Sequence, residues 1–149
     1  MIVATRHGPR HTRMLAAMTR TALVLGSSGS VGAALLHGLL GDDGFATVVT
    51  LSRRSQPEAV AAARAANRRL VEKLVPDMTP AALAEATLEA VRDSEGDVEG
   101  FSVLGVGAGT AKLTIDEHRA VDVALNEAFA RGLRGSQRVP HLALMTSAG

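Results

Sequence analysis

The chain has 149 residues, the length of one domain with room for a hydrophobic core, and its 46% hydrophobic and 21% charged residues are typical of a globular protein. A net charge of +1 gives no bulk attraction to nucleic acid or to an anionic membrane, and the lack of cysteine excludes disulfides and thiolate metal sites. No apolar run reaches the roughly 18 residues of a membrane span. We therefore expect neither nucleic acid nor membrane as a partner.

The first 20 residues differ from the rest of the chain because they carry four arginines and no acidic residue. Such a start is found in mitochondrial transit peptides. We favour the simpler interpretation, a disordered basic extension with a natural start at Met18, a folded domain over residues 21–149 and a cytoplasmic location. His7 and His11 have the helical spacing of metal ligands, but no third ligand lies near them, so we expect no metal site.

Residues 22–25, Ala-Leu-Val-Leu, predict a buried strand that leads directly into a cluster of glycines. Gly26, Gly29 and Gly32 have the spacing G-x-x-G-x-x-G, and an apolar helical pattern follows them through Val31, Leu35, Leu36 and Leu39. Strand, glycine turn and helix together are the context of a dinucleotide site. There Gly26 permits a sharp turn, Gly29 lets the backbone approach a pyrophosphate, and Gly32 lets the helix pack on the strand. The helix start near Ser30 presents free N–H groups to the phosphates.

The glycine cluster has two other interpretations. An ordinary strand–turn–helix junction can also need three glycines. A P-loop is excluded, because no Gly-Lys-Ser/Thr follows and the first lysine of the chain is Lys73.

Residues 46–51 are rich in β-branched side chains and predict a second strand, which ends in Ser52-Arg53-Arg54. In a dinucleotide fold this point, about 20 residues past the glycines, faces the adenosine ribose. Two guanidinium groups suit a 2′-phosphate, whereas an acidic residue would bind the 2′-hydroxyl of NAD. We therefore favour NADP over NAD; the other interpretation is that both arginines are solvated loop charges.

The middle of the chain alternates helical and strand patterns. Ser55 and Glu58 have the spacing of a capping box before an alanine-rich helix that continues to Arg68. Residues 70–75 predict a short third strand. Thr79-Pro80 starts a further helix to about Arg92, whose buried residues are expected to be Leu83, Leu88 and Val91.

A second glycine-rich junction follows the fourth predicted strand, residues 101–104, and runs over residues 105–109. Thr114 and Glu117 form another capping box, which opens a helix to about Gly135. We assign His118, near its start, to the surface. The apolar face of this helix is expected to hold Val121, Leu125, Ala128, Phe129 and Leu133. Residues 140–145 predict the fifth strand.

The element order, with GSSGSVG, SRR, LGVGAG and LMTSAG after the first, second, fourth and fifth strands, resembles the short-chain dehydrogenase/reductase superfamily. The nearest resemblance is to its atypical NAD(P)-binding branch, the NmrA-like and NAD-dependent epimerase/dehydratase-like proteins. It implies an α/β fold, a Rossmann-like doubly wound parallel sheet with strand order 3-2-1-4-5, incomplete at its C-terminal edge. It also implies a dinucleotide cofactor and a small-molecule substrate that the sequence does not identify.

By position, the resemblance implies several groups of site residues. The phosphate loop would be Gly26, Ser28, Gly29, Ser30, Val31 and Gly32. Arg53 and Arg54 would contact the 2′-phosphate, Asp77 and Met78 would lie by the adenine, and Gly105, Val106 and Gly107 by the nicotinamide-side ribose. Ser147 matches a serine that many members carry at the end of the fifth strand, which makes it the candidate catalytic residue.

The chain also departs from this family. Active members carry Tyr-x-x-x-Lys after the fifth strand, whereas this chain has no tyrosine and ends before that helix. We therefore expect a fragment, the cofactor half of an oxidoreductase that transfers hydride to or from a small carbonyl or alcohol. The second hypothesis is a non-catalytic regulatory protein that senses NADP and binds a protein partner. The sequence does not define the oligomeric state.

Overall fold

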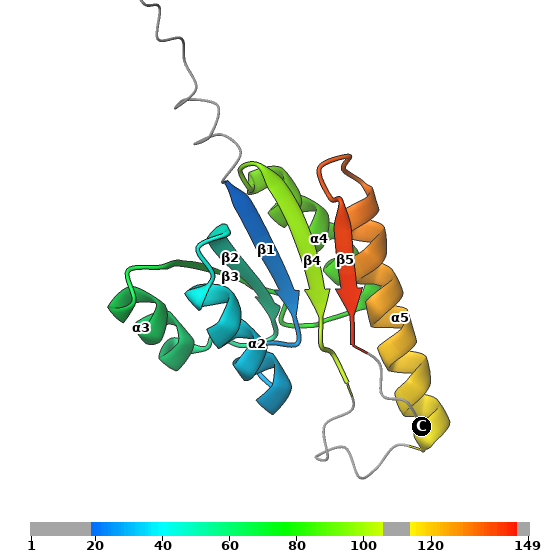
Figure 1. Ribbon diagram of the computed structural model, residues 1–149. Coiled ribbons are helices and arrows are strands. Elements are labelled where there is room, and N and C mark those ends of the chain that lie inside the picture. Colours follow the sequence, from blue (N-terminus) through cyan, green and yellow to red (C-terminus); the bar gives the residue numbers. More distant parts are fainter. Residues whose placement is uncertain (1–18, 106–113, 146–149) are drawn as a thin grey trace, which may run out of the picture.

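The computed structural model describes residues 19–105 and 114–145. They form a parallel sheet in the predicted order β3-β2-β1-β4-β5, with α2 and α3 on one face and α4 and α5 on the other (Figure 1). The elements are β1 (Arg20–Leu25), α2 (Ser30–Gly41), β2 (Phe45–Ser52), α3 (Pro57–Ala65), β3 (Arg69–Leu74), α4 (Pro80–Asp93), β4 (Asp97–Ser102), α5 (Ile115–Arg134) and β5 (His141–Leu144).

The central strand β1 is buried along almost its whole length because helices cover both of its faces. Its side chains alternate between two hydrophobic clusters. Leu23 and Leu25 join the cluster under α4 and α5, whereas Ala22 and Val24 join the one under α2 and α3. The carboxyl end of β1 is thereby fixed from both sides, and the glycine loop starts from a rigid point.

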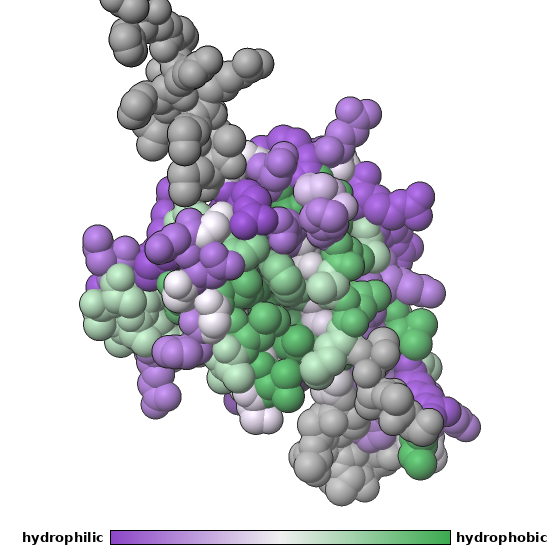
Figure 2. Space-filling view, viewed as in Figure 1, coloured by the Kyte–Doolittle hydropathy of each residue, from purple (hydrophilic) through white to green (hydrophobic). Residues whose placement is uncertain are grey.

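The edge strand β5 is the most exposed part of the sheet. Leu142, Leu144 and the following Met145 keep 37%, 48% and 47% of their surface accessible. Figure 2 shows apolar surface over the part of the sheet that α2 and α3 leave open. The buried strand residues of the two clusters come from β1, β2 and β4.

The fourth strand begins earlier than predicted, at Asp97 instead of residue 101, and ends at Ser102. The start of this strand is difficult to predict from the sequence because Asp97 and Glu99 are unfavourable in a strand interior. Glu99 is accommodated by Arg20, whose guanidinium lies 2.6 Å from its carboxylate on the neighbouring strand. Arg20, which the sequence placed in the basic extension, is therefore the first residue of β1 and part of the sheet.

The helix α3 differs from its prediction at both ends. Ser55 and Glu58 do not form the expected capping box, because the hydroxyl of Ser55 donates to Glu72 and the N-cap is Gln56. At its other end the helix stops at Ala65 instead of Arg68. Asn67 adopts a left-handed conformation with φ 53° there, and Arg68 N–H bonds back to the Ala63 carbonyl, which is a Schellman ending.

The other predicted helix starts are confirmed. Thr79 caps α4 by accepting from Ala82 N–H, and Thr114 with Glu117 forms the full capping box of α5. Leu83 and Val91 are buried as expected, whereas Leu88 is half-buried. On α5 the expected apolar face is buried from Leu125 onward.

Candidate dinucleotide site

Gly26 makes the turn out of β1, as the sequence predicted. Its φ is +90°, a left-handed conformation that favours glycine. A Cβ atom built on Gly26 would lie 2.8 Å from the backbone nitrogen of Leu104, just beyond β4. The absence of a side chain therefore lets the loop after β1 lie against the chain leaving β4.

Gly32 and Gly29 differ sharply in what a side chain would meet. A Cβ on Gly32 would lie 2.0 Å from the carbonyl oxygen of Gly26, so α2 packs on the turn only because this residue is glycine. A Cβ on Gly29 would meet nothing closer than that same oxygen at 3.9 Å. The packing of the protein itself therefore requires glycine at position 32 but not at position 29.

The first turn of α2 is open to an anion. Its N-cap, Gly29, provides no side-chain hydrogen bond, and the turn holds no acidic residue. By contrast, threonines cap α4 and α5. Ser28, Ser30 and Val31 are exposed around this turn. An uncapped helix start offers backbone N–H groups and the positive end of the helix dipole to a phosphate.

A cleft of about 320 Å³ opens at the carboxyl ends of the strands, on the α5 side of the glycine loop. In doubly wound sheets this edge is where ligands bind. The cleft brings together residues from four separate loops that the sequence singled out. These are Gly26, Ser28, Arg53, Asp77, Met78 and Gly105.

The remaining predicted residues lie elsewhere. Ser30, Val31 and Gly32 lie in the first turn of α2, after Gly29, and none of these four lines the cleft. Arg54 does not line it either; its carbonyl accepts a hydrogen bond from the buried Ser52 hydroxyl at 2.9 Å. Val106, Gly107 and Ser147 lie outside the described residues.

Met78 lines the cleft in an unfavourable backbone conformation, with φ 43°. A non-glycine residue in this region costs free energy and persists only where its surroundings hold it. Here Met78 N–H donates to the Val75 carbonyl, and the side chain packs against the core under α4 and α5. The tight turn after β3 thus presents Asp77 and Met78 together at the edge of the cleft.

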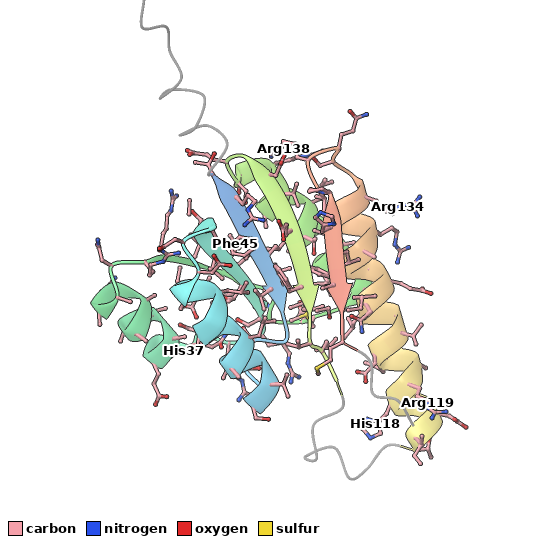
Figure 3. The ribbon with its side chains drawn as sticks, in the orientation of Figure 1. His37, Phe45, His118, Arg119, Arg134 and Arg138 are labelled. Carbon is pink, nitrogen blue, oxygen red and sulfur yellow. The ribbon has the colours of Figure 1, made fainter. Side chains whose placement is uncertain are left out.

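One wall of the cleft is supplied by α5, and this wall was not predicted from the sequence. His118, Val121, Asp122 and Leu125 line it, at the helical spacing i, i+3, i+4, i+7. Figure 3 labels His118 in the first turn of α5, beyond the ends of the strands. Val121 shares a face of α5 with Leu125, as predicted, but it is 50% exposed, because α5 extends past the sheet.

The position of this wall is fixed from β4. The hydroxyl of Ser102, 2% exposed at the end of the strand, donates to Asn126 Oδ1 at 2.6 Å. The amide nitrogen of Asn126 donates in turn to the Asp122 carbonyl at 2.9 Å. Two hydrogen bonds therefore tie the cleft-lining turn of α5 to the end of the sheet.

Among the described residues there is no cluster of three or more metal-ligating side chains. Over the same ranges, no helix combines the length and the apolar character required to cross a membrane. The ionisable residues that line the cleft are Arg53, Asp77, His118 and Asp122.

No family model and no curated protein matches this chain. Solved structures do match. The 3-oxoacyl-[acyl-carrier protein] reductase of Brucella melitensis shares 15% identity at a TM-score of 0.66, over 87% of this chain and 57% of its own. A mutant short-chain dehydrogenase/reductase of Serratia marcescens shares 23% identity at 0.61, over 78% and 50%.

A third match is the short-chain dehydrogenase of Mycobacterium paratuberculosis, solved with NAD bound. It shares 18% identity at a TM-score of 0.61, over 88% of this chain and 57% of its own. The chain therefore spans about half the length of these solved structures. Over that half, it has the Rossmann-like fold of the short-chain dehydrogenase/reductases.

Proposed function

We propose that this chain is the NADP(H)-binding part of an oxidoreductase of the short-chain dehydrogenase/reductase type. The observation that carries the proposal is that Gly26 and Ser28, which line the cleft, lead directly into the uncapped start of α2, where Gly29 leaves space that the protein's own packing does not need. The bound dinucleotide would supply hydride chemistry on a small carbonyl or alcohol. The chain's own residues would bind and orient it.

Each loop has a distinct part in this proposal. The first turn of α2 would hold the pyrophosphate through Ser28, Gly29, Ser30 and Val31, with Gly26 and Gly32 shaping the loop. Arg53 would face the 2′-phosphate with Arg54 beside it, which is the basis for preferring NADP over NAD. Asp77 and Met78 would flank the adenine. Gly105, Val106 and Gly107 would lie by the nicotinamide-side ribose, and Ser147 would be the catalytic residue.

The test is a titration of the protein with NADPH and with NADH. The chain has no tryptophan and no tyrosine, so fluorescence of the reduced nicotinamide can be followed without their emission. We expect saturable binding of both cofactors, with NADPH bound at least about tenfold more tightly, as one good charge-assisted contact provides. Failure of both to bind would contradict the proposed function. Equal affinity would contradict only the preference for NADP.

A further inference from the structure

The segment that carries Arg53 and Arg54 is anchored by a carboxylate from the neighbouring strand. Glu72 of β3 accepts from the backbone N–H of Gln56 at 2.5 Å and from the hydroxyl of Ser55 at 2.7 Å. Parallel pairing of β2 with β3 brings Glu72 opposite Thr50 and so close to the chain leaving β2. Both oxygens of one carboxylate thereby hold the end of this short segment.

The same segment is also joined to the glycine loop. The side-chain amide of Gln56 donates to Ser27 Oγ at 2.8 Å. Ser27 is only 1% exposed and lies between Gly26 and Ser28, both of which line the cleft. The hydrogen bonds from Glu72 to Gln56 and from Gln56 to Ser27 therefore connect β3, the segment of residues 53–56 and the loop that precedes α2.

We infer that Glu72 and Gln56 are positioning residues that set the discrimination between NADPH and NADH. This inference rests on the proposed function. Arg53 is exposed, and a long exposed side chain on an unrestrained loop loses conformational entropy when it binds. Hydrogen bonds at Ser55 and Gln56 restrain the backbone that carries Arg53 relative to the phosphate-binding turn, so less entropy is lost when one ligand contacts both.

The charge of Glu72 affects NADPH affinity in the opposite direction to its hydrogen bonds. Its negative charge would repel a 2′-phosphate, so removal of that charge alone would strengthen NADPH binding. The positioning effect predicts the reverse for a variant that breaks the hydrogen bonds. Glu72→Ala removes charge and hydrogen bonds together, whereas Glu72→Gln removes the charge but keeps an acceptor for Gln56 N–H and a polar partner for Ser55. The two variants separate the two effects.

The experiment titrates NADPH and NADH into the wild-type protein, Glu72→Ala, Glu72→Gln and Gln56→Ala. We expect the NADPH to NADH affinity ratio to fall by about threefold to tenfold in Glu72→Ala and Gln56→Ala, the cost of ordering one long side chain on binding. Glu72→Gln should stay within about twofold of the wild type or above it, because its geometry is kept. The matched control is Glu89→Ala, which removes an exposed carboxylate that pairs with Lys73 on β3 but does not contact the segment.

A double substitution tests whether Glu72 acts through Arg53. In an Arg53→Ala background, Glu72→Ala should cause no further fall in the affinity ratio, because coupled residues are non-additive. A higher ratio in both Glu72 variants would show that only its charge matters and would overturn the inference. An unchanged ratio in both Glu72→Ala and Gln56→Ala would also overturn it. If the wild-type protein binds neither dinucleotide, the proposed function itself fails.

Discussion

The carbonyl oxygen of Gly26 lies where a side chain on Gly32 would begin, only 2.0 Å from the position of its Cβ. The backbone of residue 32 fixes where a Cβ would lie, and the oxygen belongs to the backbone of Gly26, so no rotamer change can relieve this contact. Gly32 thus holds the first turn of α2 against the loop that leaves β1. Gly29, three residues earlier, has open space on its Cα and an ordinary φ of −78°.

The first prediction follows from this difference. Gly32→Ala should destabilise the fold by more than about 2 kcal/mol, as overpacking does. Gly29→Ala should change stability by less than about 1 kcal/mol, because its backbone conformation suits alanine whereas its N-cap position favours glycine over alanine. The same Gly29→Ala change should weaken NADPH binding more than tenfold, since its methyl group would occupy pyrophosphate space. Denaturant unfolding and cofactor titration measure the two effects, and unchanged NADPH affinity in Gly29→Ala would remove this loop from the site.

The second prediction separates the two arginines. Arg53 lines the cleft and Arg54 does not, so Arg54→Ala, which removes the same charge one residue away, should lower NADPH affinity less than Arg53→Ala does. A charge-assisted hydrogen bond contributes about 1.5–3 kcal/mol, so Arg53→Ala should lower NADPH affinity roughly tenfold or more and leave NADH affinity unchanged. The loss should shrink at high salt, where the charges are screened. An equal loss for both cofactors would assign Arg53 to a part that they share.

The glycine loop could be predicted because its signal is local, whereas the strand order was implied by the family resemblance. The run 22–25 and the three glycines follow one another in the sequence, and the structure places Gly26 and Gly32 in the roles expected from that spacing. The sequence does not show which of Arg53 and Arg54 lines the cleft, because both follow the same buried strand. Only the structure distinguishes them.

The features that were not predicted from the sequence depend on residues far apart in the chain. Ser55 was expected to cap α3 because Glu58 lies three residues on, but Glu72, 17 residues from Ser55, reaches the same hydroxyl through the pairing of β2 with β3. Val121 was expected on the apolar face of α5 with Leu125, and the sequence does not show that this face is exposed at Val121. Only the length of the sheet decides where that face leaves the core and begins to line the cleft.

The third prediction tests the α5 wall of the cleft. Val121 lines the cleft, whereas Val123 is similarly exposed, at 56% against 50%, and does not. Val121→Trp should therefore abolish cofactor binding by filling the cleft, and Val123→Trp should leave binding unchanged. Neither change should alter the melting temperature by more than about 2 °C, because exposed substitutions rarely affect stability by more than about 0.5 kcal/mol. Equal binding by both variants would place the cofactor away from α5.

The last prediction concerns the start of α5 and acid pH. The Glu117 carboxylate accepts from Thr114 N–H at 2.8 Å and from the Thr114 hydroxyl at 2.9 Å, and these bonds lower its pKa below the ordinary glutamate value. A carboxyl group whose pKa is lower in the folded state stabilises that state above the unfolded pKa, about 4.3 for glutamate. That contribution is lost as the pH falls through the lower, folded value. The first turn of α5, which carries His118 into the cleft wall, should therefore fray at acid pH.

The measurement is an NMR titration of the Glu117 side-chain carboxyl. Thr114→Ala removes the hydroxyl and should raise the Glu117 pKa toward the ordinary value, while the backbone bond at position 114 preserves part of the shift. The matched control is Thr79→Ala, which removes the equivalent N-cap of α4 and should leave the Glu117 titration unchanged. The capping box would be contradicted by a Glu117 pKa that is the same in Thr114→Ala and in the wild type. Amide exchange in residues 115–118 should accelerate with falling pH relative to intrinsic rates in the wild type, and already at neutral pH in Thr114→Ala.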